Sequence, residues 1–333
     1  MTEVYEIGSD GNALDLDALA EFVPETVSLD QRDLLLSRFG PVVENLWKQK
    51  ARIDQDVEGY RAARDKLLGD LKEAKESSRT RAGRKFEEIC TVADFFSEIS
   101  DHSLVVDLCG APGAFSLVLQ QNFPTLKILG FSLKSGISWF PEISRNFRSF
   151  YGVDGDGDLY SAANRKSLVE EISDHCCPLV LADGGFEEIS DLQELVLSPL
   201  IFSEFITAIS LLAEHGNFLC KIFDCFSELT RSIIFLLTRI FRRVLVVKPA
   251  SSRVVNSERY LLCLRKIADL PQIADLPAGK GFLSLVPLEM MDKDLKFVDS
   301  MEVMTVDIAV RQTAALRRVL DHRDSRHKRV KRA

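Results

Sequence analysis

Short apolar segments alternate with longer helical segments between residues 78 and 266, and this alternation constrains the fold more than any other feature of the chain. Strands and helices that alternate through short connections favour a doubly wound, mainly parallel sheet. Only a loop separates the last two predicted strands, so we expect them to form an antiparallel hairpin. The predicted strands are 103–108, 126–132, 179–182, 216–223, 244–248 and 260–265, and the predicted helices are 113–121, 192–215 and 228–241.

Composition and pattern divide the chain into four regions. Residues 1–30 are acidic and turn-rich, and we expect them to be flexible, because they carry eight acidic side chains and no basic one. Residues 31–77 form a helical extension, in which apolar residues recur at helical spacing among many charges. Residues 78–267 form the α/β domain. Residues 268–333 form a helical or mixed extension with a basic tail.

The net charge of −8 arises at the N-terminus, because the residues after position 30 hold equal numbers of acidic and basic side chains. The distribution of charge therefore decides what the protein can bind. Three interpretations of the basic tail stay open: a solvated helix end, a nuclear-import signal, or an arm that contacts phosphates. The basic residues of the tail are Arg317, Arg318, Arg323, Arg326, Lys328, Arg329, Lys331 and Arg332.

Cysteine usage and apolar patterning argue against an exported, metal-binding or membrane-embedded protein. None of the seven cysteines forms a C-x-x-C pair and the five histidines are scattered, so we expect reduced thiols and no metal site. Residues 1–30 lack the basic residue and the apolar run of a secretory signal. The longest apolar runs, such as 233–237, are too short to span a bilayer, so we expect no membrane partner.

Two loops of the α/β domain are candidates for ligand binding. The sequence D-L-C-G-A-P-G-A-F-S at 107–116 links a strand to a helix, where small residues let the backbone approach a ligand. A purely structural turn is the alternative. The alternating Asp and Gly residues of 151–159 suggest a calcium loop, but Leu159 and Arg165 occupy the positions that need Gly and Glu. We interpret this segment as a loop that meets the adenosine part of a cofactor, or as a surface turn.

Five motifs together resemble the FtsJ-like ribose 2′-O-methyltransferases. Besides 107–116, they are R-A-G-R-K at 81–85, L-A-D-G-G at 181–185, C-K-I-F-D at 220–224 and N-S-E-R-Y at 256–260. The resemblance implies a Rossmann-fold methyltransferase with a mainly parallel, seven-stranded sheet flanked by helices. It also assigns a K-D-K-E tetrad to Lys85, Asp183, Lys221 and Glu258.

The chain is most similar to the branch of this family that is specific for capped messenger RNA. The segments that carry this similarity are G-F-S-L-K at 130–134, Y-G-V-D-G-D-G-D at 151–158 and K-P-A-S-S-R at 248–253. The resemblance covers residues 48–288. It departs at Thr80, where relatives often have Asn, and after Gly185, where the segment is shorter than in cellular enzymes.

The resemblance implies that the cofactor is S-adenosylmethionine and that the substrate is 5′-capped messenger RNA. The methyl acceptor would be the ribose 2′-OH of the first transcribed nucleotide, which DNA lacks. Methylation of ribosomal or transfer RNA, methylation of the second cap nucleotide, and a non-catalytic binding module are the alternatives. Expected partners include the transcription or capping machinery. The expected location is the nucleus for a cellular protein, and the host-cell cytoplasm or the virion for a viral one.

By resemblance, each member of the tetrad has a role in methyl transfer. Lys221 is the base, or the group that steers the 2′-OH, and Asp183 orients it and faces the methyl group. Lys85 tunes the charge of the site and contacts the substrate, while Glu258 holds Lys85 and the ribose. A lysine acts as a base only when it is neutral, so we expect the second lysine and partial burial to lower the pKa of Lys221. A structural ion-pair network is the alternative.

The remaining candidate residues are carried over position by position, and no metal ligand is among them. The candidate cofactor residues are Thr80, Cys109, Gly110, Ala111, Pro112, Gly113, Ala114, Phe115, Asp158 and Leu159. The candidate residues for RNA and cap are Lys50, Arg64, Gln193, Ser251, Ser252 and Arg253. Solvated helix charges are the alternative for Lys50 and Arg64. Contacts with phosphates would make RNA binding sensitive to salt.

Overall fold

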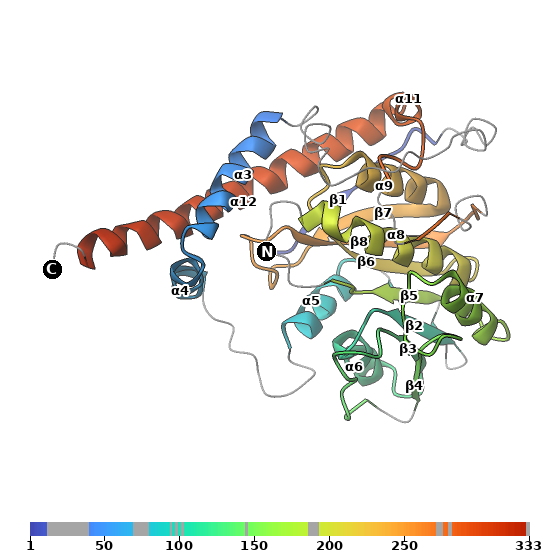
Figure 1. Cartoon of the computed structure of the whole chain (residues 1–333). Helices are drawn as coiled ribbons and strands as arrows, with labels where there is room; N and C mark the ends of the chain where they lie inside the picture. Colours follow the sequence, from blue (N-terminus) through green and yellow to red (C-terminus); the bar gives the residue numbers. More distant parts are fainter. Residues whose placement is uncertain are drawn as a thin grey trace.

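One mixed sheet forms the centre of the molecule, and helices cover both of its faces (Figure 1). The computed structural model describes residues 1–11, 40–68, 80–93, 95–96, 99–100, 103–143, 146–185, 193–270, 276–278 and 282–330, with side chains to residue 325. The mixed sheet with helices on both faces confirms the predicted α/β architecture. Predictions for residues 12–39, 69–79 and 331–333 lie outside the described residues.

The sheet has eight strands in the order β1-β7-β8-β6-β5-β2-β3-β4. Strands β6, β5, β2, β3 and β4 run parallel, whereas β8, β7 and β1 are joined by antiparallel pairing. Strands β2 and β5 are neighbours, but the chain continues from β2 to β3 on one side and from β5 to β6 on the other side. Ligands of open α/β sheets bind at such a switch point. The strands are β1 (Glu3–Glu6), β2 (Leu104–Leu108), β3 (Lys127–Phe131), β4 (Phe147–Phe150), β5 (Leu179–Ala182), β6 (Asn217–Phe223), β7 (Phe241–Lys248) and β8 (Glu258–Lys266).

The sheet differs from the prediction at both edges. Strand β1 adds an eighth strand beside β7, with Glu3 opposite Lys248, so the first residues are not flexible as we expected. Ile7, which follows β1, is buried in the main core. Strand β4 was also not predicted, because its four residues carry no continuous apolar pattern. The antiparallel hairpin of β7 and β8 is confirmed.

Successive side chains along the strands point to opposite faces of the sheet and pack into two hydrophobic cores, one on each face. Along β2, Leu104, Val106 and Leu108 face the core under α7, α8 and α9. Val105 faces the opposite core, under α5 and α6. The helices are α3 (Gly40–Asp54), α4 (Val57–Leu68), α5 (Arg81–Cys90), α6 (Ala114–Asn122), α7 (Ala162–Glu171), α8 (Gln193–Leu211), α9 (Glu228–Ile240), α11 (Leu288–Asp292) and α12 (Leu295–Val330).

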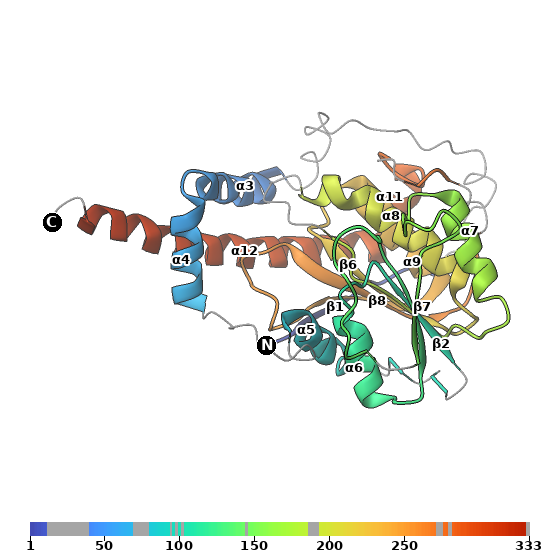
Figure 2. The same cartoon turned by 60° about the horizontal axis from the view of Figure 1, so that its bottom comes forward.

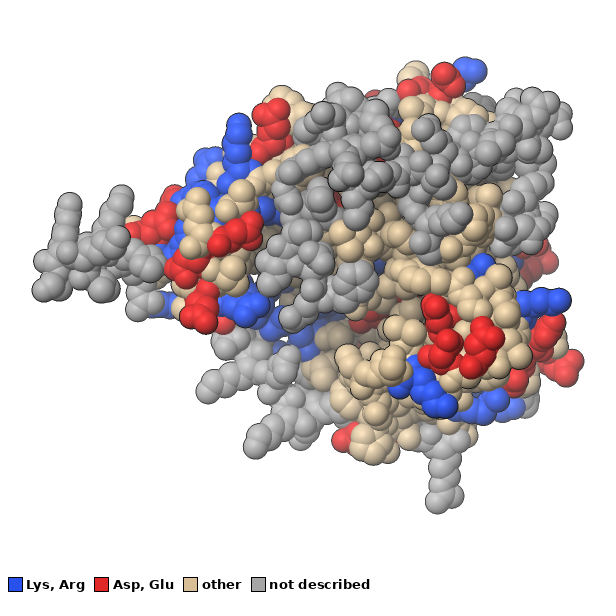
Figure 3. All heavy atoms as spheres, viewed as in Figure 1, with Lys and Arg blue, Asp and Glu red and all other residues tan. Residues whose placement is uncertain are grey.

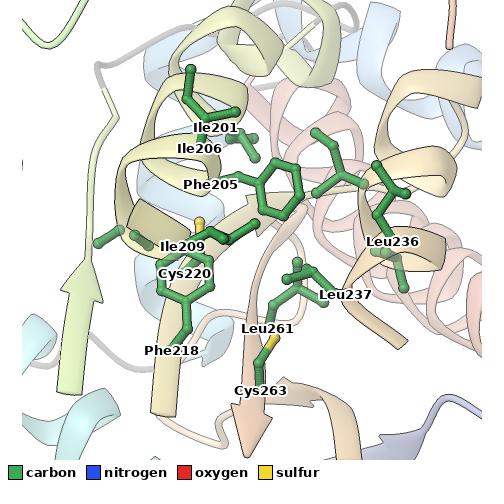
Figure 4. Close-up of a cluster of buried hydrophobic side chains, with 14 of the residues drawn as sticks. Ile201, Phe205, Ile206, Ile209, Phe218, Cys220, Leu236, Leu237, Leu261 and Cys263 are labelled. Atoms are coloured by element: carbon green, nitrogen blue, oxygen red, sulfur yellow. The ribbon is translucent and has the colours of Figure 1, made fainter. Parts of the chain in front are cut away.

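Helix α8 is long and apolar enough to cross a membrane by length and composition, and 72% of its apolar window is buried inside the fold. The prediction that every apolar run is too short to span a bilayer is therefore wrong for this helix. Figure 4 shows Phe205 and Ile209 of α8 in one cluster with Phe218 of β6 and Leu236 of α9. A helix with apolar residues on most sides is expected where it is packed between a sheet and other helices.

The two terminal extensions meet each other and form a third hydrophobic core. Helices α3 and α4 pack against the 36-residue helix α12, which extends beyond the sheet (Figures 1 and 2). Their apolar faces enclose Phe226, from the loop after β6, and Val255, from the loop before β8. Near the end of α12, Arg323 is buried and donates to the main-chain oxygen of Arg52 at 2.8 Å. Arg323 is therefore part of the packing and not of a solvated tail.

Candidate active site

The four tetrad residues converge at the carboxyl ends of the central parallel strands. Asp183 follows β5 and Lys221 lies in β6. Strand β8 runs antiparallel to β6, with Glu258 opposite Phe223. Glu258, the first residue of β8, therefore lies at the edge of the sheet where β6 ends. Lys85 reaches the same place from helix α5, where it is buried. The structure thus brings together residues from four separate elements.

Two ion pairs organise the tetrad. Lys85 Nζ lies 2.6 Å from Oε1 of Glu258. Lys221 Nζ lies 3.2 Å from Oδ1 of Asp183 and donates to the main-chain oxygen of Asp183 at 2.8 Å. The Tyr260 hydroxyl donates to Oδ1 of Asp183 at 3.2 Å. Asp183 therefore holds Lys221 through both its carboxylate and its backbone, as the resemblance implied.

The electrostatic environment of Lys221 differs from the expectation. Burial disfavours its ammonium form, but Asp183, Glu258 and Glu204 favour it more strongly, so the pKa of Lys221 is raised. The prediction of a lowered pKa is wrong for the protein without ligands. Carboxylates around the ammonium outweigh burial and like-charge repulsion, because nearby opposite charges stabilise the protonated form.

A third lysine lies behind the tetrad. Lys248 is buried, and its ammonium donates to the main-chain oxygens of Asn256 and Glu258 at 2.8 and 2.6 Å and to Oδ1 of Asn256 at 2.7 Å. Burial, with help from Arg259 and Lys85, lowers the pKa of Lys248 to about 7. Burial also opposes ionisation of Glu258, yet Lys85, Lys221 and Lys248 together lower the pKa of that carboxyl. Lys248 thus supports the backbone that carries Glu258.

Two candidate RNA residues touch the tetrad or its supporting loop. The Ser252 hydroxyl donates to Oε1 of Glu258 at 3.2 Å. Gln193, at the start of α8, accepts a hydrogen bond of 2.9 Å from the hydroxyl of Ser257, the residue before Glu258. Ser251 lies beside Ser252, and its backbone donates to Oε1 of Glu88 at 3.1 Å. Ser252 therefore contacts the tetrad directly, whereas Gln193 contacts the residue before Glu258 and Ser251 contacts α5.

A cavity of about 310 Å³ opens between the ends of β2, β3 and β5. Four candidate cofactor residues line it: Cys109, Ala111, Asp158 and Leu159. The other wall residues were not predicted, although Ser132 and Leu133 belong to the G-F-S-L-K motif at 130–134. The missed residues are Ser132, Leu133, Ser135, Gly136, Ile137, Gly157, Tyr160, Gly185 and Leu200.

The walls of the cavity suit the adenine ring and the ribose of S-adenosylmethionine. Its walls include the apolar Leu133, Ile137 and Leu159, which suit an adenine ring, and the Asp158 carboxylate, which suits ribose hydroxyls. The cavity also reaches the tetrad. A side-chain carbon added at Gly185, which lines the cavity, would lie 3.1 Å from Cε of Lys221. A methyl donor in the cavity would therefore lie next to Lys221.

The other candidate cofactor residues shape the cavity and do not line it. Phe115 is buried in the core and stacks on Phe86 with ring centroids 4.5 Å apart. Ala114 is also buried, and Gly113 is the N-cap of α6 with a φ of 99°. A side-chain carbon at Gly110 would lie 2.1 Å from the Asp107 carboxylate, so this position needs glycine. Pro112, between these residues, completes the turn.

Thr80 caps a helix instead of lining the cavity. Its hydroxyl accepts a hydrogen bond of 3.1 Å from the backbone of Gly83, which is the usual geometry of a helix N-cap. The cap fixes the start of α5, the helix that carries Lys85. Thr80 therefore contributes to the site by orienting that helix.

The acidic loop 151–159 is held by hydrogen bonds within the protein. Asn164 of α7 donates to Oδ1 of Asp156 at 2.9 Å and to the main-chain oxygen of Asp158 at 3.0 Å. Its own side-chain oxygen accepts from the backbone of Asp154 at 2.9 Å. Gly157, with a φ of +75°, passes so close to Ser132 that an added side-chain carbon would lie 1.9 Å from the Ser132 carbonyl oxygen. The loop is thus a rigid wall of the cavity.

The candidate RNA residues Lys50, Arg64 and Arg253 form ion pairs within the protein. Lys50 lies 3.1 Å from the buried Asp224 carboxylate, which also lies 3.5 Å from Arg259. Arg64 and Arg253 lie 2.6 and 3.7 Å from the same oxygen of Asp65. Figure 3 shows basic and acidic side chains interleaved over α3 and α4. Lys50 therefore links α3 to the residue that follows β6, whereas Arg64 and Arg253 come together at Asp65.

A second cavity, also of about 310 Å³, lies on the Ser252 side of the tetrad. The segment 248–254 forms one wall of it, and Arg311 of α12 and Glu3 of β1 contribute to others. Three candidate RNA residues, Ser251, Ser252 and Arg253, line this cavity. Ser252 therefore connects the second cavity, which it lines, to Glu258 of the tetrad.

The switch-point cavity beside a lysine and an acid at the strand ends defines an S-adenosylmethionine-dependent methyltransferase of the α/β class. The sequence model of the FtsJ-like methyltransferases matches residues 78–266 of this chain. The chain therefore belongs to the FtsJ-like methyltransferase family.

Curated relatives extend the similarity beyond the methyltransferase domain. The chain is 33% identical over 311 residues to cap-specific mRNA (nucleoside-2′-O-)-methyltransferase 1 of Trypanosoma brucei brucei, with 84% of each chain covered. It is 32% identical over 305 residues to the protein of the same name from Trypanosoma cruzi, covering 83% of this chain and 84% of that one. A solved ribosomal RNA methyltransferase from Plasmodium falciparum is 19% identical with a TM-score of 0.42, and the match covers 56% of this chain and 98% of that one.

Proposed function

We propose that this enzyme transfers a methyl group from S-adenosylmethionine to the ribose 2′-OH of the first transcribed nucleotide of capped messenger RNA. The observation that carries the proposal is the position of Lys221, between the cofactor cavity at Gly185 and the Lys85–Glu258 pair. The named function of the relatives from Trypanosoma supports it, because the similarity spans 84% of both chains for the first of them.

Bound S-adenosylmethionine would supply a methyl group that its sulfonium already activates. The residues of the chain must then align the 2′-OH and remove its proton. Asp183 holds Lys221 at two points, so the lysine ammonium can donate to and steer the hydroxyl. RNA that covers the site removes the remaining water, which disfavours the ammonium form and moves Lys221 towards the neutral base. Glu258 keeps Lys85 in place beside the substrate.

The second cavity is the place where this proposal puts the transcribed nucleotides. Its wall segment 248–254 ends next to the tetrad, since the hydroxyl of Ser252 contacts Glu258. Arg253 and Arg311 can balance phosphate charges there. The cap would then approach from the side of Arg64 and Gln193. A nuclear location and a partner in the transcription or capping machinery are further parts of the proposal.

A methyl-transfer assay with two RNAs tests the proposal. The RNAs are identical except for an N7-methylguanosine cap, and nuclease digestion locates the label transferred from S-adenosylmethionine. We expect label on the first ribose of the capped RNA alone. Label on the uncapped RNA, or on an internal ribose, would move the function to modification of other RNAs. Label on the second nucleotide would change the position, and no label on either RNA would contradict the proposal.

A further inference from the structure

Helix α8 carries a carboxyl group that the tetrad motif does not include. Glu204 is 0% exposed and lies beneath the ends of β5 and β6. Its Oε1 accepts a hydrogen bond of 3.0 Å from the backbone of Gly184, and its Oε2 lies 3.6 Å from Sγ of Cys220. Gly184 directly follows Asp183, and Cys220 directly precedes Lys221. Glu204 therefore contacts the immediate neighbour of each member of one catalytic ion pair.

The contact with Gly184 is closely packed. A side-chain carbon added at Gly184 would lie 2.1 Å from Oε1 of Glu204. The hydrogen bond fixes the peptide that joins Asp183 to Gly184, and the carbonyl of this peptide accepts the 2.8 Å hydrogen bond from Lys221. The position of Glu204 thus determines where the main-chain acceptor of Lys221 lies.

Charge connects Glu204 to the same lysine. Burial raises the pKa of Glu204 to about 8, and the Lys221 ammonium opposes this rise. Above about pH 8, where Glu204 is ionised, its negative charge is one of the causes that raise the pKa of Lys221. The titratable groups that interact with Glu204 are Lys221 and Cys220 of β6, Asp183 after β5, Cys109 after β2, and Tyr160 before α7.

A buried carboxyl group at this place needs a reason other than packing. Burial of a carboxylate is costly, and a neutral amide could accept the same hydrogen bond from Gly184. Buried titratable groups with shifted pKa values gather at functional sites, where their charge acts on a reacting group. The geometry and the charge of Glu204 both act on Lys221.

We propose that Glu204 is a positioning residue that holds the Asp183–Gly184 peptide in place and, once ionised, favours the protonated form of Lys221. The proposal rests on the proposed role of Lys221 in methyl transfer. It separates two contributions of one side chain, because a hydrogen bond can be kept while the charge is removed.

Two substitutions separate these contributions. Glu204→Gln keeps an oxygen acceptor for Gly184 and removes the charge, whereas Glu204→Met removes both. Ser203→Ala is the matched control, because Ser203 is also buried in α8 and its hydroxyl donates to Pro199 within the helix. The readouts are kcat and KM for capped RNA across pH and the ¹³Cε titration of Lys221 by NMR, with Lys221→Ala used for assignment.

We expect Glu204→Gln to leave KM for capped RNA unchanged and to lower the titration midpoint of Lys221 by about one pH unit, the size that a nearby charge commonly contributes. The rising limb of the kcat profile should shift in the same direction. Glu204→Met should lower kcat about 10- to 100-fold, because small displacements of a reacting group are costly. Ser203→Ala should change neither quantity.

An unchanged Lys221 midpoint in Glu204→Gln would overturn the electrostatic part of the proposal. Equal kcat values for Glu204→Met and Ser203→Ala would overturn the positioning part. A kcat for Glu204→Gln as low as that of Glu204→Met would also overturn the positioning part. The lysine titration requires no RNA, so it tests Glu204 even if capped RNA proves not to be the substrate.

Discussion

The ammonium nitrogen of Lys85 lies 2.6 Å from Oε1 of Glu258, and this contact joins helix α5 to strand β8. The two residues come from opposite ends of the methyltransferase domain. Lys85 is held by Glu258, whereas Lys221 is held by Asp183 and lies next to the cofactor cavity. The predictions below concern this lysine, the cavity wall and the supports behind them.

Replacement of Lys221 should abolish catalysis and preserve cofactor binding. Lys221→Ala removes the group that steers and deprotonates the 2′-OH, and general-base assistance is worth about 10²–10⁴-fold in rate. Single-turnover methyl transfer and calorimetric binding of S-adenosylmethionine measure the two effects. Lys166→Ala is the control, because the Lys166 side chain is 80% exposed on α7. Turnover at the wild-type rate in Lys221→Ala would show that the lysine is not catalytic.

Two glycines of the acidic loop should differ in their importance for cofactor binding. Gly155 and Gly157 have similar φ values, +73° and +75°, but a side-chain carbon meets nothing within 4 Å at Gly155 and the Ser132 carbonyl oxygen at Gly157. Gly155→Ala should therefore cost about 1 kcal/mol of stability, through its left-handed backbone alone. Gly157→Ala should also displace the cavity wall and weaken binding of S-adenosylmethionine at least about tenfold. Equal affinities of the two variants would contradict this account of the wall.

Lys50 should matter for stability more than its neighbour Lys48. The Lys50 side chain is 13% exposed and pairs with the buried Asp224, whereas the Lys48 side chain is 74% exposed beside Glu44. Loss of Lys50 leaves the buried Asp224 carboxylate with Arg259 as its remaining partner. Lys50→Met should therefore lower the free energy of unfolding by at most about 3 kcal/mol. Lys48→Met should have almost no effect. Urea unfolding of both variants measures the difference, and equal midpoints would argue that Lys50 serves the RNA instead.

Asp107 should make the protein less stable as pH rises from about 4 to 7. Burial raises the pKa of Asp107 to about 7, although the 2.6 Å hydrogen bond from Ser116 opposes this rise. In this pH range the folded carboxyl stays protonated while the unfolded one ionises, so the folded state binds more protons and loses stability as pH rises. The loss can reach about 4 kcal/mol.

Asp107→Asn tests this dependence, because the amide oxygen can still accept from Ser116. The free energy of unfolding, measured in urea at several pH values, should fall less steeply for the variant than for the wild type. Glu204, whose pKa is raised from 4.5 to about 8, adds a similar dependence between about pH 4.5 and 8 in both proteins, so only the difference between their curves reports on Asp107. Parallel curves for the two proteins between pH 4 and 7 would show that Asp107 ionises normally in the folded state.

The sequence was sufficient for those features that are written locally in the chain. The apolar segments around Val105 and Leu219 predicted buried strands, because burial on both faces requires continuous apolar residues. The motif contexts of Lys85, Asp183, Lys221 and Glu258 selected these four residues before any geometry was known, and the structure brings all four together.

Only the tertiary structure decided the properties that depend on distance in space. Strand β1 is four residues long, and it forms because β7 offers an open edge. Lys50 of α3 pairs with Asp224, which follows β6 and lies 174 positions away in the chain. The pKa of Lys221 is raised by carboxylates from β5, β8 and α8, which sequence order does not place together. Motifs determine which side chains are present, whereas packing sets the distances on which electrostatic interactions and hydrogen bonds depend.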